Sequence, residues 1–455
     1  MTSDPFIAIV GAAFVRADPP ALEAYAADAL GQPHPPDLVV LPANTAEVAA
    51  IARLCNAERI PLVVRGAGTG YTGGAVPTRG GVVVSMERFT RILEIDPINL
   101  LAVVEPNVIT ADLQRAVERV GLFYPPDPAS LESSALGGNV AECAGGPRAF
   151  KYGTTRRYVL ALEAVLPTGE IVETGSKAVK NVVGYDLTQL LVGSEGTLAI
   201  ITRITLRLIP KPPARATLLA IFADVRAAVD AVTALIERRV VPAAIELVDA
   251  ESLRVVRDRL GDEAAPPGAG ALLIVEADGV RAAVDEEIER VAQACRAGGA
   301  MRVTLAADHV ERERLWEARR RISLALRATG LLKINHDVVV PRGRIPELFV
   351  VIDELRARYR LTIAAFGHAG DGNIHVNLMV DPADGEERAR AKEAERVLFE
   401  RVVALEGSIS GEHGIGFAKA PYIGIELAPD EIALMKRVKA AFDPNGILNP
   451  GKIFP

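Results

Sequence analysis

From position 61 the sequence reads Pro61-Leu-Val-Val-Arg-Gly-Ala-Gly-Thr-Gly-Tyr-Thr-Gly-Gly74, an apolar run that passes into a loop with five glycines in nine residues. The run is typical of a β-strand, and Gly68–Gly73 matches the G-x-G-x-x-G spacing of dinucleotide-binding loops. In nicotinamide-binding domains such a loop opens a helix, whereas this chain continues to another predicted strand at Gly81–Ser85. The loop therefore favours a dinucleotide pyrophosphate held by backbone N–H groups in a mixed α+β domain. Glycines that serve only as turn formers explain this single stretch equally well.

Two further glycine-rich blocks follow, Gly137-Gly-Asn-Val-Ala-Glu-Cys-Ala-Gly-Gly146 and Gly193-Ser-Glu-Gly-Thr197, with Tyr152-Gly-Thr154 between them. In order and spacing, these stretches resemble the FAD-binding domain shared by flavoproteins of the vanillyl-alcohol-oxidase type. Within that family the chain is similar to the glycolate oxidase flavin subunit and to D-lactate and D-2-hydroxyglutarate dehydrogenases. The resemblance implies an α+β fold with a two-lobed FAD-binding domain and a C-terminal α+β cap domain that contains an antiparallel sheet.

The same resemblance implies which residues bind FAD. The first loop would cradle the pyrophosphate, the second block would line the flavin, and the third would lie at the adenosine side. Relatives with covalently attached flavin carry a histidine in the first loop, where this chain has Thr69, so we expect non-covalent FAD. The expected FAD contacts are Arg65, Gly66, Ala67, Gly68, Thr69, Gly70, Gly73, Gly74, Ser134, Gly137, Gly138, Asn139, Ala144, Gly145, Gly146, Tyr152, Gly153, Glu195 and Gly196.

The segment Pro210-Lys-Pro-Pro213 marks the predicted domain boundary, because successive prolines stiffen the chain. We expect an N-terminal segment at 1–35, the FAD-binding domain at 36–213, and a substrate-binding cap domain at 214–455 whose C-terminal segment returns to the flavin. Helices are expected in the cap domain at 225–239, 281–296, 312–328, 345–359 and 386–405. The turn-rich tail from Asp443 is expected to be docked rather than frayed.

Three of the six histidines lie in two glycine-rich stretches, and two of them belong to His368-Ala-Gly-Asp-Gly-Asn-Ile-His375. Strands are expected on either side, at 362–367 and 374–379. A two-residue turn at Asp371-Gly372 would pair these strands with His368 directly opposite His375. Their Cβ atoms would then lie about 4.5–5.5 Å apart on one face, which suits two ligands of one divalent metal. Asn377 would project from the same face as a substrate contact.

The third histidine lies in Gly411-Glu-His-Gly414, where flanking glycines permit close approach of a ligand. Two histidines and one carboxylate leave coordination positions open for substrate, so we expect His368, His375 and Glu412 to bind zinc, iron or manganese. Taken singly, each histidine is more simply explained as a turn cap or a polar filler. Related dehydrogenases have matching His-x-Gly-Asp-Gly-Asn-x-His-x-Asn and Gly-Glu-His-Gly stretches, and this resemblance implies that His413 is the general base.

A substrate carboxylate would need a cation, and the guanidinium fork of arginine suits both oxygens. Arg319 and Ser323 share a helix face at the i,i+4 spacing, and the resemblance places substrate contacts at both. A solvated basic helix face is an equally weighted alternative. Where the 2-hydroxyglutarate enzymes have a lysine two residues before an aspartate, this chain has Asn335 before Asp337, with Lys333 displaced. We therefore do not expect a second carboxylate on the substrate.

Composition narrows the classes of partner. A formal net charge of −7 argues against a nucleic-acid surface, and no apolar run approaches the length of a transmembrane segment. The three cysteines are scattered, without the spacing of an iron–sulfur site, which predicts a reducing cytoplasm and a separate electron acceptor. That acceptor would be an iron–sulfur subunit, an electron-transfer flavoprotein, a quinone or oxygen. Any membrane contact would be peripheral and made through a partner.

Together these features predict FAD-dependent oxidation of a small 2-hydroxy acid, such as glycolate or D-lactate, to the 2-keto acid. Hydride would pass to FAD, His413 would take the hydroxyl proton, and the metal would orient the substrate. One alternative is a flavin-binding accessory subunit without catalysis of its own. Another is a metal-dependent hydrolase, which would leave the glycine blocks without a role.

Overall fold

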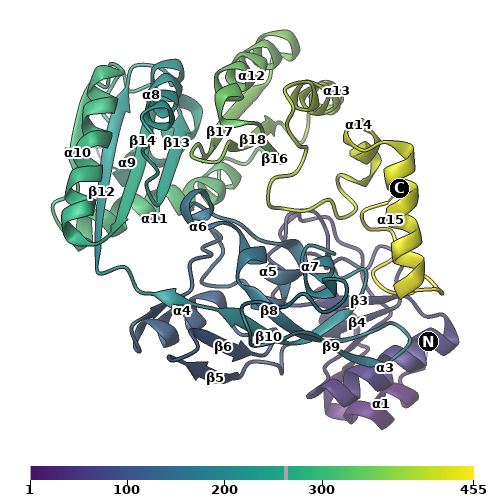
Figure 1. Cartoon of the computed structure of the whole chain (residues 1–455). Helices are drawn as coiled ribbons and strands as arrows, with labels where there is room; N and C mark the ends of the chain where they lie inside the picture. The colour runs from purple at the N-terminus through teal and green to yellow at the C-terminus, as the bar shows by residue number, and fades with distance from the viewer. Residues whose placement is uncertain (1, 261–264, 455) are drawn as a thin grey trace. The chain divides into compact units, whose positions relative to one another are not determined.

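The structure is a computed structural model that describes residues 2–260 and 265–454. The chain forms two compact units, and each is built from more than one stretch of sequence (Figure 1). The first comprises Met1–Gly145, Gly153–Lys211 and Glu412–Pro455, and the second comprises Gly146–Tyr152 and Pro212–Gly411. Among the described residues, no helix combines the length and the apolar character needed to cross a membrane.

One lobe of the first unit is a four-stranded sheet of order β1-β2-β4-β3. Its strands are β1 (Val15–Arg16), β2 (Leu38–Val40), β3 (Leu62–Arg65) and β4 (Val82–Ser85). The three parallel strands are rich in valine, as expected where both faces of a sheet are covered. Helix α3 (Thr45–Glu58) links β2 to β3, and the Asn44 side chain caps it by accepting a hydrogen bond from the Glu47 N–H at 3.0 Å.

The other lobe of the first unit is a five-stranded antiparallel sheet of order β5-β6-β10-β8-β9. Its strands are β5 (Ile92–Asp96), β6 (Leu101–Val104), β8 (Val159–Val165), β9 (Ile171–Gly175) and β10 (Ile200–Arg207), and β7 (Leu122–Phe123) pairs separately with β11 (Ile209–Pro210). Helices α4 (Thr110–Glu118), α5 (Leu136–Glu142) and α7 (Leu187–Leu191) belong to this part of the chain. Val165 and Ile200 share a buried cluster with α3 and the first sheet, so one core joins the two lobes.

Both ends of the chain belong to the first unit. Helices α1 (Asp4–Val10) and α2 (Pro19–Glu23) lie near the N-terminus, and α14 (Ile423–Glu426) and α15 (Pro429–Phe442) lead to the C-terminal tail. The tail pairs with β3, where the Leu62 N–H donates to Ile447 O at 2.8 Å and the Asn449 N–H donates to Leu62 O at 2.7 Å. The expectation of a docked tail is therefore confirmed.

The second unit is built on a seven-stranded antiparallel sheet of order β15-β12-β14-β13-β17-β18-β16, which confirms the predicted sheet type. The strands are β12 (Ala214–Phe222), β13 (Ala244–Asp249), β14 (Ala271–Gly279), β15 (Arg302–Leu305), β16 (Leu332–Val339), β17 (Thr362–His368) and β18 (Asn373–Val380). The helices are α6 (Ala149–Tyr152), α8 (Val225–Glu237), α9 (Ala250–Leu260), α10 (Arg281–Ala297), α11 (His309–Arg327), α12 (Ile345–Tyr359) and α13 (Gly385–Ala404). Helices α8, α10, α12 and α13 cover one face, and α9 and α11 pack on the other (Figure 1).

The hairpin between β17 and β18 has a different register from the predicted one. His368 lies opposite Asn373, and Phe366 lies opposite His375, so the connection is four residues long. The predicted two-residue turn was wrong because Gly372 packs on the end of β16. Its N–H donates a hydrogen bond to His368 O, and its carbonyl accepts one from the Val340 N–H. The shift is an even number of residues and therefore leaves every side chain on its predicted face. The rings of His368 and His375 remain neighbours, with centroids 5.1 Å apart.

Candidate functional site

One face of the seven-stranded sheet gathers the polar residues of the second unit. Residues directly opposite each other in paired strands share a face, and residues two apart in one strand share it as well. By this rule the α9/α11 face carries Glu246, Glu276, Lys333, Asn335, Asp337, His368, Asn373, His375 and Asn377. The opposite face carries His336, whose ring packs edge-on against Phe399 of α13 at 5.0 Å. The structure thus brings the predicted ligands His368 and His375 and the predicted substrate contact Asn377 to the face under α11.

Glu246 connects two of the predicted site residues on this face. Its carboxylate lies 2.5 Å from Nδ1 of His368 and 2.5 Å from a terminal nitrogen of Arg319. The arginine also stacks over the Phe366 ring, with its central carbon 4.7 Å from the ring centroid. The contact of Arg319 with Glu246 attracts as an ion pair but lacks hydrogen-bond geometry. Arg319 Nε and Nη2 are buried without a hydrogen-bond partner in the described chain.

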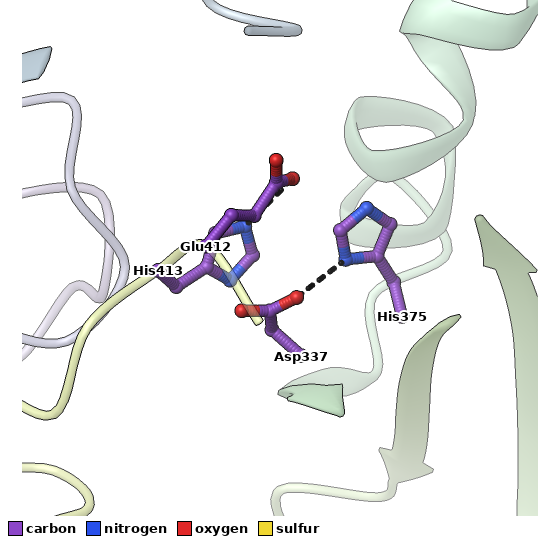
Figure 2. A group of neighbouring side chains, drawn as sticks. All are labelled: Asp337, His375, Glu412 and His413. Carbon is purple, nitrogen blue, oxygen red and sulfur yellow. Dashed lines mark ion pairs between the residues drawn. The ribbon is translucent and has the colours of Figure 1, made fainter. Parts of the chain in front are cut away.

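Asp337 and His375 form a second pair of acid and imidazole on adjacent strands (Figure 2). The Asp337 carboxylate lies 3.6 Å from Nδ1 of His375 and accepts a hydrogen bond from the Asn373 amide at 2.6 Å. The Gly411 N–H donates to the same carboxylate at 3.0 Å. A Cβ at Gly411 would lie 2.3 Å from the Asn373 amide nitrogen, so a side chain here would displace that amide from its bond to Asp337. Glu412 follows Gly411 by one peptide bond.

Two buried atoms on this face are suited to a ligand. The Asn377 amide donates to Ala364 O at 3.1 Å and to His375 O at 3.0 Å, while its Oδ1 has no partner in the described chain. Nε of Arg319 is a buried donor that likewise has no hydrogen-bond partner in the described chain. An acceptor and a donor that are both buried and unpaired favour a polar ligand on the sheet face, since such groups otherwise reduce stability.

Lys333, which the sequence suggested was displaced, lies beside the predicted substrate residue Ser323. Its Nζ donates to the Ser323 hydroxyl at 2.5 Å. Burial, together with the neighbouring positive charge of Arg327, lowers the pKa of Lys333 to about 7. In the unfolded chain a lysine titrates near pH 10.4. Between these pH values the unfolded chain binds a proton that the folded chain does not, so stability should rise with pH.

Replacing Lys333 by methionine is therefore expected to raise the free energy of unfolding most strongly at and below neutral pH. The difference in unfolding free energy between this variant and the wild type should decrease by about 2 kcal/mol between pH 7 and pH 9. Over this range the buried wild-type amine becomes neutral, so its burial no longer costs the free energy of removing a charge from water. Urea unfolding followed by the fluorescence of Trp316, the single tryptophan of the chain, reports on the second unit. A difference in unfolding free energy that stays constant from pH 7 to pH 9 would show that the Lys333 amine is not removed from water in the folded protein.

In the first unit the three glycine-rich blocks converge. The Gly193 N–H donates to Val140 O at 2.9 Å and the Glu195 N–H to Ala141 O at 2.8 Å, which joins the third block to the second. The Asn449 amide donates to Gly74 O at 2.9 Å and to Glu195 O at 2.8 Å, which joins the third block to the first. Stretches far apart in sequence thus form one backbone-lined region.

The first loop has the properties of an anion cradle. The backbone N–H groups of residues 67–70 donate to no other backbone carbonyl within the described chain. A Cβ at Gly68, whose φ is +68°, would lie 2.2 Å from the Arg65 guanidinium, so this glycine lets the cation fold over the loop. Burial lowers the pKa of Arg65 and raises that of nearby Asp28. Free N–H groups and a partly desolvated arginine fit a pyrophosphate.

Two expected flavin contacts also hold the second block in shape. The Asn139 amide donates to Thr110 Oγ1 at 2.7 Å, and that hydroxyl lies 3.0 Å from Ser134 Oγ. The Gly137 N–H donates to Pro106 O at 2.6 Å, and a Cβ at Gly137 would lie 2.5 Å from the Pro106 ring. Glycine is therefore required at position 137 for packing as well as for any ligand.

Glu412 and His413 belong to the first unit and lie next to the glycine blocks. The His413 ring stacks on Tyr71, with centroids 5.2 Å apart, and its carbonyl accepts a hydrogen bond from the Thr72 hydroxyl at 3.1 Å. The Glu412 carboxylate lies 4.0 Å from Nε2 of His413 (Figure 2). A Cβ at Gly145 would lie 2.5 Å from Glu412 Oε2, so a larger residue at this position would displace the Glu412 carboxylate.

Residues 146–152 leave the first unit and pack on the second, although Tyr152 was expected to contact FAD. The Tyr152 hydroxyl donates to both Asp278 carboxylate oxygens, at 2.9 and 2.8 Å, and Lys151 Nζ lies 2.6 Å from the same carboxylate. Burial, followed by the bond to Asp278, raises the pKa of Tyr152. Asp278 is 3% exposed, and a buried carboxylate lowers stability unless it is paired, so Tyr152 and Lys151 compensate for its removal from water.

Replacing Tyr152 by phenylalanine is expected to lower the free energy of unfolding of the second unit by about 1.5–3 kcal/mol, the contribution of a hydrogen bond to a charged group. Trp316 fluorescence during urea unfolding measures the change. The matched control is Tyr185→Phe, because Tyr185 is 95% exposed. Equal unfolding midpoints for the two variants would contradict a structural role for the Tyr152 hydroxyl.

Sequence reasoning missed several residues that support the site. Glu246 and Asp337 are carboxylates inside buried strands. An acidic residue within an apolar strand sequence could have indicated them, since a buried acid requires a partner. Asn449 carried no signal beyond its place in a turn-rich tail. Its function as a bridge between Gly74 and Glu195 depends on how the tail docks.

Two family models match the chain. The FAD binding domain matches residues 36–175, and the C-terminal domain of FAD linked oxidases matches residues 211–453, which is more than half of the chain. The glycolate oxidase subunit GlcD of Bacillus subtilis is 44% identical over 421 residues, covering 92% of this chain and 89% of the relative. A D-lactate dehydrogenase of Archaeoglobus fulgidus is 38% identical over 416 residues, covering 91% of each chain.

A solved structure shares the fold. The 4-ethylphenol oxidase of Gulosibacter chungangensis superimposes with a TM-score of 0.81 at 22% identity, covering 99% of this chain and 96% of that chain. The predicted resemblance to vanillyl-alcohol-oxidase-type flavoproteins and the predicted α+β fold are therefore confirmed. By both family models and by relatives that match along nearly its whole length, the chain belongs to the FAD-linked oxidases and is a flavoprotein enzyme.

Proposed function

We propose that the enzyme oxidises a small 2-hydroxy acid, of the size of glycolate or D-lactate, to the 2-keto acid. The observation that carries this proposal is the α9/α11 face of the second unit, where Arg319 and Asn377 keep buried polar atoms without partners beside two acid-paired histidines. A 2-hydroxy acid has a carboxylate that Arg319 could bind and a hydroxyl that could lie beside His368 and His375. The names of the relatives, a glycolate oxidase subunit and a D-lactate dehydrogenase, support the same substrate class.

FAD would be held non-covalently by the converging glycine blocks of the first unit, and when bound it supplies the hydride acceptor. The first loop offers its backbone N–H groups and Arg65 to the pyrophosphate. The proposed contacts are the residues expected from the sequence in the three blocks, with Gly153 at the edge of the first unit. Relatives with covalently attached flavin carry a histidine in the first loop, where this chain has Thr69, and a threonine hydroxyl cannot replace that ring nitrogen as the attachment point.

A divalent metal would be held by His368, His375 and Glu412. Metal-bound histidines characteristically place the other ring nitrogen against a carboxylate, which fixes their orientation. Nδ1 of His368 lies against Glu246, and Nδ1 of His375 faces Asp337, which leaves Nε2 of each ring for a ligand. Glu412 would complete the set, because it follows Gly411, whose N–H is bonded to Asp337. Such an ion supplies positive charge that orients the substrate hydroxyl and lowers its pKa.

The chain's own residues would then share the chemistry. Arg319 and Ser323 would hold the substrate carboxylate, and Asn377 would hydrogen-bond the substrate through its free Oδ1. His413 would take the hydroxyl proton as the α-hydrogen leaves as hydride, and its stacking on Tyr71 keeps the ring in one orientation. Any divalent metal among zinc, iron and manganese is compatible with this ligand set.

Re-oxidation of the flavin would require a separate acceptor. The sequence has three cysteines, of which Cys55 and Cys295 are buried and none is paired, so an iron–sulfur centre within this chain has no ligand set. The Bacillus subtilis relative is named as a subunit, which supports a protein acceptor such as an iron–sulfur subunit or an electron-transfer flavoprotein. A quinone is the small-molecule alternative.

The test is stopped-flow mixing of the yellow protein with a panel of D- and L-2-hydroxy acids. We expect glycolate or D-lactate to bleach the flavin absorbance, and acid denaturation of the protein to release free FAD. A protein that releases FAD but is bleached by no member of the panel would instead be a flavin-binding accessory subunit.

A further inference from the structure

We infer that Glu195 is a positioning residue, because its carboxylate fixes the backbone that follows His413 and thereby holds the imidazole of the proposed base in place. This inference rests on the proposed function, in which His413 takes the hydroxyl proton of the substrate. It gives the Glu195 side chain a role other than the FAD contact expected at this position.

The Glu195 carboxylate holds the loop that carries His413 through two backbone groups. The Ile415 N–H donates to Glu195 Oε1 at 2.7 Å, and the Gly416 N–H donates to Glu195 Oε2 at 2.6 Å. Backbone hydrogen bonds to an ionised carboxylate are stronger than those between neutral groups. A Cβ at Gly414 would lie 3.0 Å from the carboxylate carbon of Glu195. The carboxylate therefore lies beside the three successive residues that follow the proposed base.

The carbonyl groups of this loop are held by other parts of the first unit. The Thr72 hydroxyl donates to the His413 carbonyl at 3.1 Å, and the Ile453 N–H of the tail donates to the Gly416 carbonyl at 2.8 Å. Glu195 instead binds N–H groups of the loop. We therefore expect loss of the Glu195 bonds to loosen the peptides after His413 without detaching the loop.

The backbone of Glu195 is itself fixed. Its φ is +52°, in the left-handed region that glycine adopts more readily than a residue with a Cβ. The Glu195 N–H donates to Ala141 O at 2.8 Å, and its carbonyl accepts a hydrogen bond from the Asn449 amide at 2.8 Å. An acidic residue in a conformation that favours glycine indicates that its side chain is needed. The two bonds to the loop after His413 supply a reason for that need.

The surroundings place negative charge on Glu195 rather than on its buried neighbour Glu142. Burial raises the pKa of both carboxyls. At Glu195 the two backbone N–H bonds, followed by the charges of Lys419 and Lys452, oppose this rise in pKa. At Glu142 the negative charges of Glu195 and Asp28 add to it, so the pKa of Glu142 lies well above its usual range. An ionised Glu195 has both oxygens available as acceptors, which matches the two bonds to the loop.

The test is a double-mutant cycle in the flavin-loaded enzyme, with reduction of the bound flavin by D-lactate or glycolate followed under stopped flow. Glu195→Gln keeps the size of the side chain but replaces one acceptor oxygen by an NH₂ group, so one loop N–H would face a donor. We expect it to lower the limiting rate constant by about 10- to 100-fold, as a misplacement of about 1 Å does. In the His413→Ala background it should change the rate constant by less than about twofold, because the group that it positions is already absent.

Glu58→Gln is the matched control, because Glu58 is exposed at the end of α3, and it should leave the rate constant unchanged in both backgrounds. Glu195→Asp is taken through the same cycle and should give the same pattern, because its shorter side chain keeps the charge but cannot reach both N–H groups.

A wild-type rate constant in Glu195→Gln, or an equal loss in both backgrounds, overturns this inference alone. Failure of both Glu195 variants to retain flavin would assign the residue to the FAD site and would also overturn it. An unchanged rate constant in His413→Ala would instead refute His413 as the base, and with it the positioning role of Glu195.

Discussion

Replacing His413 with alanine is expected to slow reduction of the bound flavin by the 2-hydroxy acid by about 10²–10⁴-fold, the range for loss of a general base. The substrate hydroxyl has a high pKa, so hydride transfer requires a group that takes its proton. In the structure the His413 ring is stacked on Tyr71, with ring centroids 5.2 Å apart, and its side chain keeps 19% of its surface exposed. Stopped-flow absorbance of the flavin measures the rate constant directly.

The flavin should remain bound in this variant, because His413 contributes its ring, not its backbone, to the proposed reaction. Its carbonyl bond to the Thr72 hydroxyl survives the substitution. His309→Ala is the control, since the His309 side chain is 71% exposed at the start of α11. An unchanged reductive rate constant in His413→Ala, with full flavin occupancy, would exclude His413 as the base.

Removing the two histidines of the β17/β18 hairpin should abolish binding of a divalent metal. A His368→Ala, His375→Ala double variant is expected to retain less than about one hundredth of the wild-type affinity, because the ion loses two ligands on one rigid face. Metal analysis of the purified protein, followed by titration of the metal-free protein with zinc, measures this loss. His309→Ala again serves as the control.

Two milder substitutions separate the roles of the acids. Glu246→Gln should weaken metal binding by about 10–100-fold, as is usual when the carboxylate behind a metal-bound histidine is changed. Asp337→Asn should do the same through His375. An Asp337→Asn effect as large as that of the double variant would identify Asp337 as a direct ligand. Wild-type affinity in the double variant would mean that the histidines are structural.

Much of the local structure of the second unit could be predicted from sequence. The helices expected at 225–239, 281–296 and 345–359 appear as α8, α10 and α12 with ends that agree within two residues. The strands of the hairpin were also predicted, because helical and strand periodicities are local properties of the chain. The same periodicity placed Arg319 and Ser323 on one helix face and His375 and Asn377 on one strand face.

The hairpin register shows where local reasoning fails. The Asp-Gly pair is typical of a tight turn, but Gly372 is held by Val340, which is far away in the sequence. A tertiary contact therefore decided which residues pair. The histidines remained neighbours only because the register shifted by an even number of residues.

The sequence by itself determined the glycine-rich loop after β3 and the strand and helix faces on which the proposed site residues lie. Glycine spacing, strand alternation and helical spacing are written in consecutive residues. Only the tertiary structure decided the partners of those residues, such as Glu246 for both Arg319 and His368, and Lys333 for Ser323. The physical reason is that a buried charged group needs a hydrogen-bond or ion-pair partner, and that partner usually comes from an element far away in the sequence. The first glycine loop follows the same rule, because it meets the third block through Asn449 of the tail.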